Sequence, residues 1–190
     1  SIMVDRIEVG TLMVAAAITG GEVLIPNAVS EHVQAVTSKL REVGAEVVFN
    51  GHGVRVTSRG RPRATDLKTL PYPGFPTDMQ PQMMALLSIA EGTSVITETI
   101  FDSRFKQAEE LGRMGARIRT EGRTAIIKGV PGLSGARVEA TDLRSGASLV
   151  LAGLCAEGRT VVCGVHNVDR GYQRLEQKLA SLGAKIARVE

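Results

Sequence analysis

Apolar residues recur along this chain with helical spacing, in two kinds of segment that differ in how far the apolar face extends. The segments 11–18, 79–90 and 143–156 are apolar on nearly every side. A helix without a polar face must be covered by other structure. The sequence therefore predicts three buried helices that share one interior.

Three further segments carry apolar residues on one face only, and they begin near Ser30, Asp102 and Asp169. They predict amphipathic helices that surround the buried three. Each segment ends at a Gly-Ala pair, whose glycine suits the left-handed turn that stops a helix. These glycines are Gly44, Gly115 and Gly183.

Short β-rich runs lie between the helical segments and complete the pattern. They comprise single runs at 22–25, 94–97 and 160–163, hairpins at 47–56 and 117–128, and leading strands at 64–69 and 137–140. The order of these segments repeats, which predicts an α/β domain of three βαβαββ units. The unit boundaries are about 5–60, 64–130 and 137–190 within a single domain, 1–190.

Two strands of the repeat have no counterpart in the sequence. The first unit has no room for a leading strand before Asp5, and the third has no return strand after the strand expected at 185–189. Unpaired sheet edges are usually covered or completed. We therefore expect this chain to be one domain of a longer polypeptide.

Acidic residues stand at the start of each buried helix, namely Asp5, Asp78 and Asp142. Asp78 follows a stiff proline-rich arm, 71–77, and is placed to cap the next helix. Parallel repeats bring the three positive helix ends to one face, which suits an anion. The alternative is that these are three separate caps, which need no ligand.

Basic residues favour the first interpretation. Arg104 and Arg170 fall in the expected first turn of two outer helices, and Arg144 falls in the first turn of the third buried helix. The helix dipole disfavours a cation there, so a repeated placement indicates a negatively charged ligand. The planar guanidinium fork suits phosphate and carboxylate groups.

Composition excludes several other classes of protein. With 23 Lys and Arg, 20 Asp and Glu, and 3% aromatic residues, the chain lacks a nucleic-acid platform. It has no apolar run long enough for a membrane span and no secretory signal, which predicts a cytoplasmic protein. Cys155 and Cys163 are expected to be free thiols, and no metal site or dinucleotide motif is predicted.

Several long motifs carry a family resemblance: FPTDMQ at 75–80, ITETIFDSRF at 96–105, ATDLRSGASLVLAGLCAEG at 140–158 and DRGYQRLEQKLASLGA at 169–184. In these motifs the chain resembles the UDP-N-acetylglucosamine 1-carboxyvinyltransferases, enolpyruvyl transferases that open peptidoglycan synthesis. The resemblance implies an EPSP synthase-like fold, in which two inside-out α/β barrels of three βαβαββ units enclose the active site. It also implies transfer of the enolpyruvyl group of phosphoenolpyruvate to the 3′-hydroxyl of UDP-N-acetylglucosamine, without metal or cofactor.

The resemblance assigns roles to matching residues on both sides of the reaction. Asp78 corresponds to the candidate general base at the sugar hydroxyl. Ile100, through its backbone, and Phe101 correspond to positions that touch the nucleotide sugar. Asp142 corresponds to a carboxylate that stabilises positive charge on the enolpyruvyl carbon.

The arginines correspond to the phosphoenolpyruvate site. The resemblance implies that Arg144 and Arg170 hold the phosphate and carboxylate, with Arg104 near the same anions. Tyr72 departs from the family, which has histidine there. The family's lid cysteine, its Lys-Asn pair and most uridine-diphosphate contacts have no match here, so we expect the second domain to be required and the isolated chain not to turn over.

Two alternatives stay open at this stage. The first is 3-phosphoshikimate 1-carboxyvinyltransferase, the sister enzyme with the same fold and donor. The second is a non-catalytic repeat domain that binds a partner protein through its open sheet edges.

Overall fold

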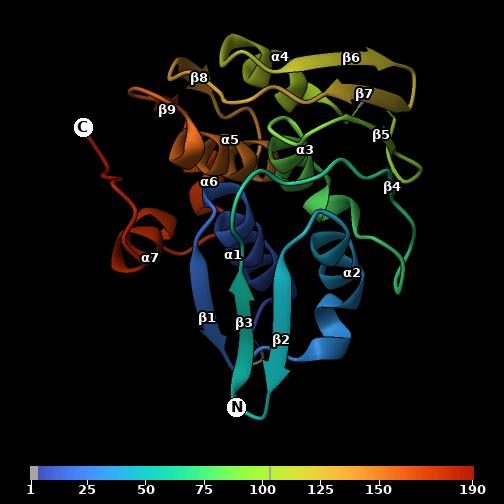
Figure 1. Cartoon of the computed structure of the whole chain (residues 1–190). Coiled ribbons are helices and arrows are strands. Elements are labelled where there is room, and N and C mark those ends of the chain that lie inside the picture. Colours follow the sequence, from blue (N-terminus) through green and yellow to red (C-terminus); the bar gives the residue numbers. More distant parts are fainter. Residues whose placement is uncertain (1–3, 103) are drawn as a thin grey trace.

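Three helices form the interior of the computed structural model, which describes residues 4–102 and 104–190. They are α1 (Arg6–Thr19), α3 (Gln80–Leu87) and α5 (Leu143–Cys155), and they pack against one another at the centre of the molecule (Figure 1). Every residue of α3 is buried, as are ten of the 14 residues of α1. The predicted buried bundle is therefore confirmed.

Sheets cover this bundle on the outside (Figure 1). The first sheet has the order β1-β3-β2 and is antiparallel. The second has the order β4-β5-β7-β6, in which only β4 and β5 are parallel, and the third pairs β8 with β9 in parallel. The strands are β1 (Glu22–Pro26), β2 (Glu46–Asn50), β3 (Gly53–Thr57), β4 (Leu67–Lys68), β5 (Thr93–Thr97), β6 (Arg117–Glu121), β7 (Thr124–Lys128), β8 (Arg137–Glu139) and β9 (Val161–Cys163).

The pairing pattern recurs between sheets. In the first sheet Glu22 of β1 and Glu46 of β2 both lie opposite Thr57 of β3. In the second sheet the central strand β7 is flanked in the same way by β5 and β6, and the parallel pair β4–β5 has its counterpart in β8–β9. An α/β architecture of repeated strand and helix order is what the sequence pattern predicts, whereas the proposed unit boundaries stay a prediction.

Shorter helices complete the fold. They are η1 (Ser30–Val33), α2 (Gln34–Glu42), η2 (Thr77–Met79), α4 (Lys106–Arg113), α6 (His166–Asp169) and α7 (Leu175–Ser181). The predicted stops are confirmed, since Gly44, Gly115 and Gly183 have φ angles of 106°, 96° and 103°. These angles lie in the left-handed region that glycine adopts without strain.

The third outer helix differs from the prediction. Instead of one helix from Asp169, the chain forms α6 and α7, separated by a turn that ends at Arg174 with φ 52°. The break has a packing cause, because Tyr172 lies in this turn with only 1% of its surface exposed and its ring is part of the core. Arg170 therefore follows α6 and does not lie in the first turn of an amphipathic helix.

The prediction of a strand at 185–189 is wrong. Residues 184–190 have no regular structure, because no strand in the described part of the chain hydrogen-bonds to them. Arg188 instead ties the segment to the helices, with Nη2 donating to Asp169 at 2.7 Å and to Glu176 at 3.2 Å. Figure 1 shows this end of the chain running out from α7 at the edge of the molecule.

Candidate active site

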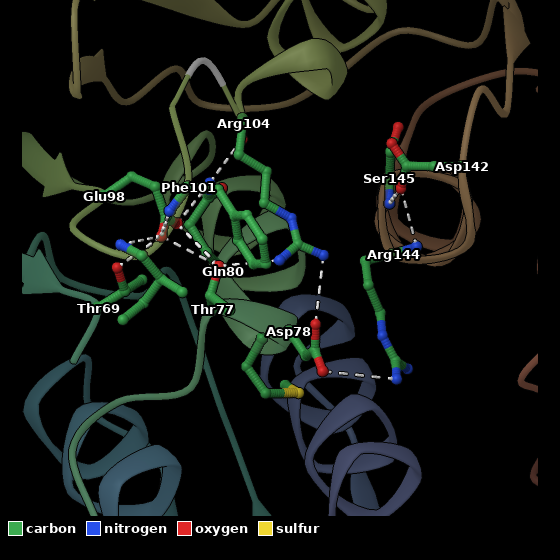
Figure 2. Close-up of polar contacts among 12 residues, drawn as sticks. Thr69, Thr77, Asp78, Gln80, Glu98, Phe101, Arg104, Asp142, Arg144 and Ser145 are labelled. Carbon is green, nitrogen blue, oxygen red and sulfur yellow. Dashed lines mark hydrogen bonds and ion pairs between the residues drawn. The ribbon is translucent and has the colours of Figure 1, made fainter. Parts of the chain in front are cut away.

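Asp78 is the centre of a charged cluster at the start of the second buried helix. Its Oδ1 accepts a hydrogen bond from Arg104 Nη2 at 3.2 Å, and its Oδ2 lies 3.8 Å from Arg144 Nη2 (Figure 2). The predicted capping role is wrong, because η2 begins after Pro76 and no side chain caps it. Both carboxylate oxygens face arginines, and the side chain stays 42% exposed.

Arg104 reaches this cluster from the loop before α4, which begins at Lys106 and not at the expected Asp102. Its Nη1 donates to Thr77 Oγ1 at 3.0 Å, and its guanidinium carbon lies 4.8 Å from the centroid of the Phe101 ring. Gln80 Nε2 holds the backbone by donating to the Arg104 carbonyl at 2.7 Å. Four contacts thus fix the position of this cation.

Arg144 and Asp142 come from the start of α5, on the other side of Asp78 (Figure 2). Asp142 caps the helix, as in the alternative of separate caps, since its Oδ1 accepts from Arg144 N at 3.1 Å and from Ser145 N at 2.9 Å. Arg144 lies in the first turn, as expected, with its side chain 14% exposed. Asp142 Oδ2 accepts no hydrogen bond from the described residues, so one oxygen remains available to a ligand.

The turn after β5 carries Ile100 and Phe101, the two positions matched to the nucleotide sugar. They are 37% and 51% exposed, so both side chains are accessible to a ligand. Phe101, Arg104 and Asp142 line a common cavity of about 310 Å³. The remaining lining residues are Pro81, Asp102, Lys106 and Gln107.

Glu98 organises this turn, and the sequence interpretation missed it. Its carboxylate is fully buried and accepts hydrogen bonds from the hydroxyls of Thr69 at 2.8 Å and Thr77 at 3.1 Å (Figure 2). The same group accepts from the backbone N–H groups of Ile100 at 3.1 Å and Phe101 at 3.4 Å. The one local signal was an acidic residue directly after the partly buried strand β5.

Not every predicted residue joins the cluster. Arg170 is exposed, and its side chain makes no hydrogen bond or ion pair with the described residues, while its backbone N–H caps α6 by donating to the Val168 carbonyl. Asp5 caps α1 through Ile7 N at 2.8 Å, as in the alternative of separate caps, and its side chain makes no hydrogen bond or ion pair with Arg104 or Arg144. Tyr72 is 64% exposed and lies beneath Arg6, whose guanidinium carbon is 5.2 Å from the ring centroid.

Other chemistries find little support in the described residues. No group of three or more His, Cys, Asp or Glu side chains converges there to hold a metal ion. Cys155 and Cys163 are free, and burial raises the pKa of the Cys155 thiol to about 11, which keeps it protonated and unreactive at neutral pH. None of the described helices is long and apolar enough to cross a membrane.

A larger cavity, of about 480 Å³, lies between α5, β9 and the segment 185–189. It is lined largely by apolar residues, with Glu176 and Arg188 among the charged ones, and it includes none of Asp78, Asp142, Arg104 and Arg144. The charged cluster around Asp78 is therefore the better candidate for chemistry. Its two carboxylates and two arginines suit a ligand with several negative groups and one exchangeable proton.

Comparison with known proteins places this arrangement in a family. The family model described as EPSP synthase (3-phosphoshikimate 1-carboxyvinyltransferase) matches residues 1–179. The chain belongs to the EPSP synthase family. The fold and the enolpyruvyl transferase resemblance expected from the motifs are thereby confirmed.

Curated relatives narrow the similarity within the family. The chain is 59% identical over 189 residues to UDP-N-acetylglucosamine 1-carboxyvinyltransferase 1 of Symbiobacterium thermophilum, covering 100% of this chain and 43% of that protein. It is 57% identical to the protein of the same name from Caldanaerobacter subterraneus subsp. tengcongensis, covering 99% of this chain and 45% of the relative. The chain thus spans less than half the length of the curated relatives it matches.

Solved structures agree on the fold. The enolpyruvyl transferase NikO from Streptomyces tendae is similar with a TM-score of 0.85 and 29% identity, over 96% of this chain and 44% of that one. An EPSP synthase from Acinetobacter baumannii is similar with a TM-score of 0.62 and 21% identity, over 84% and 38% of the two chains. The second likeness bears on the fold alone.

Proposed function

We propose that this chain supplies one side of the active site of an enzyme that transfers the enolpyruvyl group of phosphoenolpyruvate to the 3′-hydroxyl of UDP-N-acetylglucosamine. The observation that carries the proposal is the position of Asp78 between Arg104 and Arg144. The names of the relatives at 53–59% identity support this acceptor. The product would enter peptidoglycan synthesis, and hence cell-wall formation, cell shape and division.

In the proposed reaction Asp78 takes the proton of the sugar hydroxyl, whose oxygen then bonds to carbon 2 of phosphoenolpyruvate while carbon 3 gains a proton. The tetrahedral adduct next loses a proton from carbon 3, and the bond between carbon 2 and the phosphate oxygen breaks. The proton gained at carbon 3 and the proton lost from it cancel, and phosphate leaves with one proton, equal to that taken from the hydroxyl, so atoms and charges balance in the enol ether product. A general base must lie within hydrogen-bond distance of the hydroxyl, which the exposure of Asp78 permits.

The other residues would bind and stabilise. Arg144 and Arg104 hold the phosphate and carboxylate of phosphoenolpyruvate through bidentate hydrogen bonds. Asp142 offers its free Oδ2 to positive charge that develops on carbon 2. Ile100 and Phe101 contact the nucleotide sugar, and Arg170 is assigned to phosphoenolpyruvate from the motif match alone.

The partner in this proposal is a second domain. We use the term full-length enzyme for this chain joined to the remainder of a protein as long as its relatives. The lid cysteine and the Lys-Asn pair of the family have no counterpart in these 190 residues, so we expect turnover only from the full-length enzyme. A cytoplasmic location stays a prediction.

Direct binding distinguishes this function from the alternatives. Isothermal titration calorimetry of the full-length enzyme measures binding of UDP-N-acetylglucosamine and, separately, of shikimate 3-phosphate. We expect binding of the nucleotide sugar only. Preference for shikimate 3-phosphate would favour the activity named by the family model. Binding of neither, with Asp78→Asn leaving capture of a protein partner unchanged, would favour the non-catalytic repeat domain.

A further inference from the structure

Tyr172 lies buried directly against Arg144. Its side chain comes from the turn between α6 and α7 and is only 1% exposed. Arg144 Nη1 donates to the tyrosine hydroxyl at 3.2 Å, and the guanidinium carbon lies 5.6 Å from the ring centroid. The proposed reaction assigns no role to this tyrosine.

The direction of the hydrogen bonds around this hydroxyl follows from a count of protons. Thr11 Oγ1 donates its single hydrogen to the Ile7 carbonyl at 2.8 Å, because a carbonyl only accepts. The contact between Thr11 Oγ1 and Met79 Sδ, at 3.9 Å, is too long to compete. In the 2.7 Å contact between the two hydroxyls, Tyr172 must therefore be the donor.

With its proton committed to Thr11, the tyrosine oxygen presents its lone pairs to the remaining neighbours. Gln82 Nε2 donates to it at 3.3 Å and also to Thr11 Oγ1 at 3.2 Å. Arg144 Nη1 is the charged donor in this group. The hydroxyl thus accepts a hydrogen bond from Arg144. Its orientation is fixed by Thr11 of α1 and Gln82 of α3, which occupy its other hydrogen-bonding positions.

Arg144 is consequently held from two sides. Asp78 lies 3.8 Å from Nη2 and Tyr172 accepts from Nη1, while the remaining N–H groups of the guanidinium have no partner among the described residues. We propose that Tyr172 is a positioning residue, which orients Arg144 so that its free N–H groups meet the anionic groups of phosphoenolpyruvate. This inference rests on the proposed function. It adds that Tyr172 connects the buried helices to the arginine that binds phosphoenolpyruvate.

Tyr172→Phe tests the hydroxyl while keeping the ring that fills the core and faces the guanidinium. A hydrogen bond to a charged group contributes about 1.5–3 kcal/mol, so we expect the KM for phosphoenolpyruvate of the full-length enzyme to rise about tenfold or more. The KM for UDP-N-acetylglucosamine should stay unchanged. Tyr72→Phe is the matched control, since the chain's other tyrosine is 64% exposed, and it should change neither constant.

Arg144→Ala separates failure of this inference from failure of the proposed function. If Arg144→Ala leaves the KM for phosphoenolpyruvate unchanged, the assignment of Arg144 to that substrate is wrong. If Arg144→Ala raises it and Tyr172→Phe does not, only the positioning role is wrong. In the double variant the tyrosine change should add nothing, because residues that act through one another are not additive.

A purely structural role for Tyr172 predicts a different result. Both KM values would then change together, in step with a lower midpoint of urea unfolding, and that outcome would overturn the inference. Thr11→Val provides a second test if Tyr172→Phe does not fold, because it removes the acceptor of the tyrosine proton and keeps the tyrosine. We expect a selective rise in the KM for phosphoenolpyruvate there also, and an unchanged value would contradict the positioning role.

Discussion

Arg144 Nη2 lies 3.8 Å from Asp78 Oδ2, which joins the start of the third buried helix to the start of the second. The same carboxylate receives a hydrogen bond from Arg104 at 3.2 Å. A carboxylate held in this way has a defined orientation without taking part in a helix cap. Its loss should therefore affect chemistry far more than folding.

Asp78→Asn tests this expectation in the full-length enzyme. The amide cannot take the proton of the sugar hydroxyl, and loss of a general base lowers kcat by about 10²–10⁴-fold. The unfolding midpoint should change little, because the side chain is 42% exposed. The measurement is phosphate release with both substrates saturating.

Asp66→Asn serves as the control for that substitution. Asp66 is also exposed, and its Oδ1 accepts from Val95 N at 2.9 Å, a contact that an asparagine oxygen preserves. Its kcat should equal that of the unchanged enzyme. An Asp78→Asn variant as active as this control would contradict the assignment of Asp78 as general base.

The periodic features of this fold could be predicted from the sequence, because each depends on local pattern. The largely apolar segment of α3 and the glycine stops at Gly44 and Gly115 are examples. Features that depend on distant residues could not be predicted. Asp78 has the sequence of a cap, yet its oxygens face two arginines supplied by other elements.

The break between α6 and α7 shows the same limit. The sequence around Asp169 is compatible with a continuous helix, and only the position of Tyr172 in the core explains the turn. Glu98 was missed for a related reason. Its importance depends on donors from Thr69 and Thr77, which no local pattern brings together.

Glu98→Gln should destabilise the fold and disturb the substrate turn. The buried carboxylate accepts hydrogen bonds from the N–H groups of Ile100 and Phe101. A glutamine replaces one carboxylate oxygen by an NH₂ group, which is itself a donor and cannot accept these hydrogen bonds. We expect a loss of about 2–3 kcal/mol in the free energy of unfolding, measured with urea. A rise in the KM for UDP-N-acetylglucosamine should accompany it in the full-length enzyme.

Glu121→Gln is the matched control for this change. Glu121 is 78% exposed in a surface ion pair with Arg119, which contributes less than about 1 kcal/mol. Equal unfolding free energies for the Glu98 and Glu121 variants would show that the hydrogen bonds around Glu98 have little energetic value.

Asp169 gives a prediction for pH dependence. The hydrogen bond from Arg188 holds the pKa of the Asp169 carboxyl below its ordinary value. A carboxyl whose pKa is lower in the folded state contributes stability above the unfolded pKa, and loses it as the pH falls through the folded pKa. Because both side chains are more than 40% exposed, the contribution should stay below about 1 kcal/mol.

An NMR titration of the carboxyl carbon measures this shift directly. In the unchanged chain Asp169 should titrate below an unstructured aspartate, and in Arg188→Ala its pKa should rise towards that reference. The stability difference between the two proteins should shrink as the pH is lowered through the folded pKa. A pKa of Asp169 that Arg188→Ala leaves unaltered would mean that the ion pair does not form in solution.

Gly146 shows how packing reverses a preference that the sequence alone suggests. Alanine favours a helix more than glycine by about 1 kcal/mol, so Gly146 in the first turns of α5 looks replaceable. A Cβ atom there would lie 2.6 Å from Val168 Cγ2 and 2.9 Å from Ala140 Cβ. Gly146→Ala should therefore lower the free energy of unfolding, by about 1–3 kcal/mol.

Gly112 in α4 offers the opposite case within the same chain. A Cβ atom there meets nothing within 4 Å and the backbone is helical, so Gly112→Ala should raise the free energy of unfolding by about 0.4–1 kcal/mol. Urea unfolding of the two single variants measures both effects. The gain in helix propensity is the same at both positions. If both substitutions raise the free energy of unfolding, then Val168 and Ala140 leave room for a Cβ atom at residue 146 and the predicted clash is wrong.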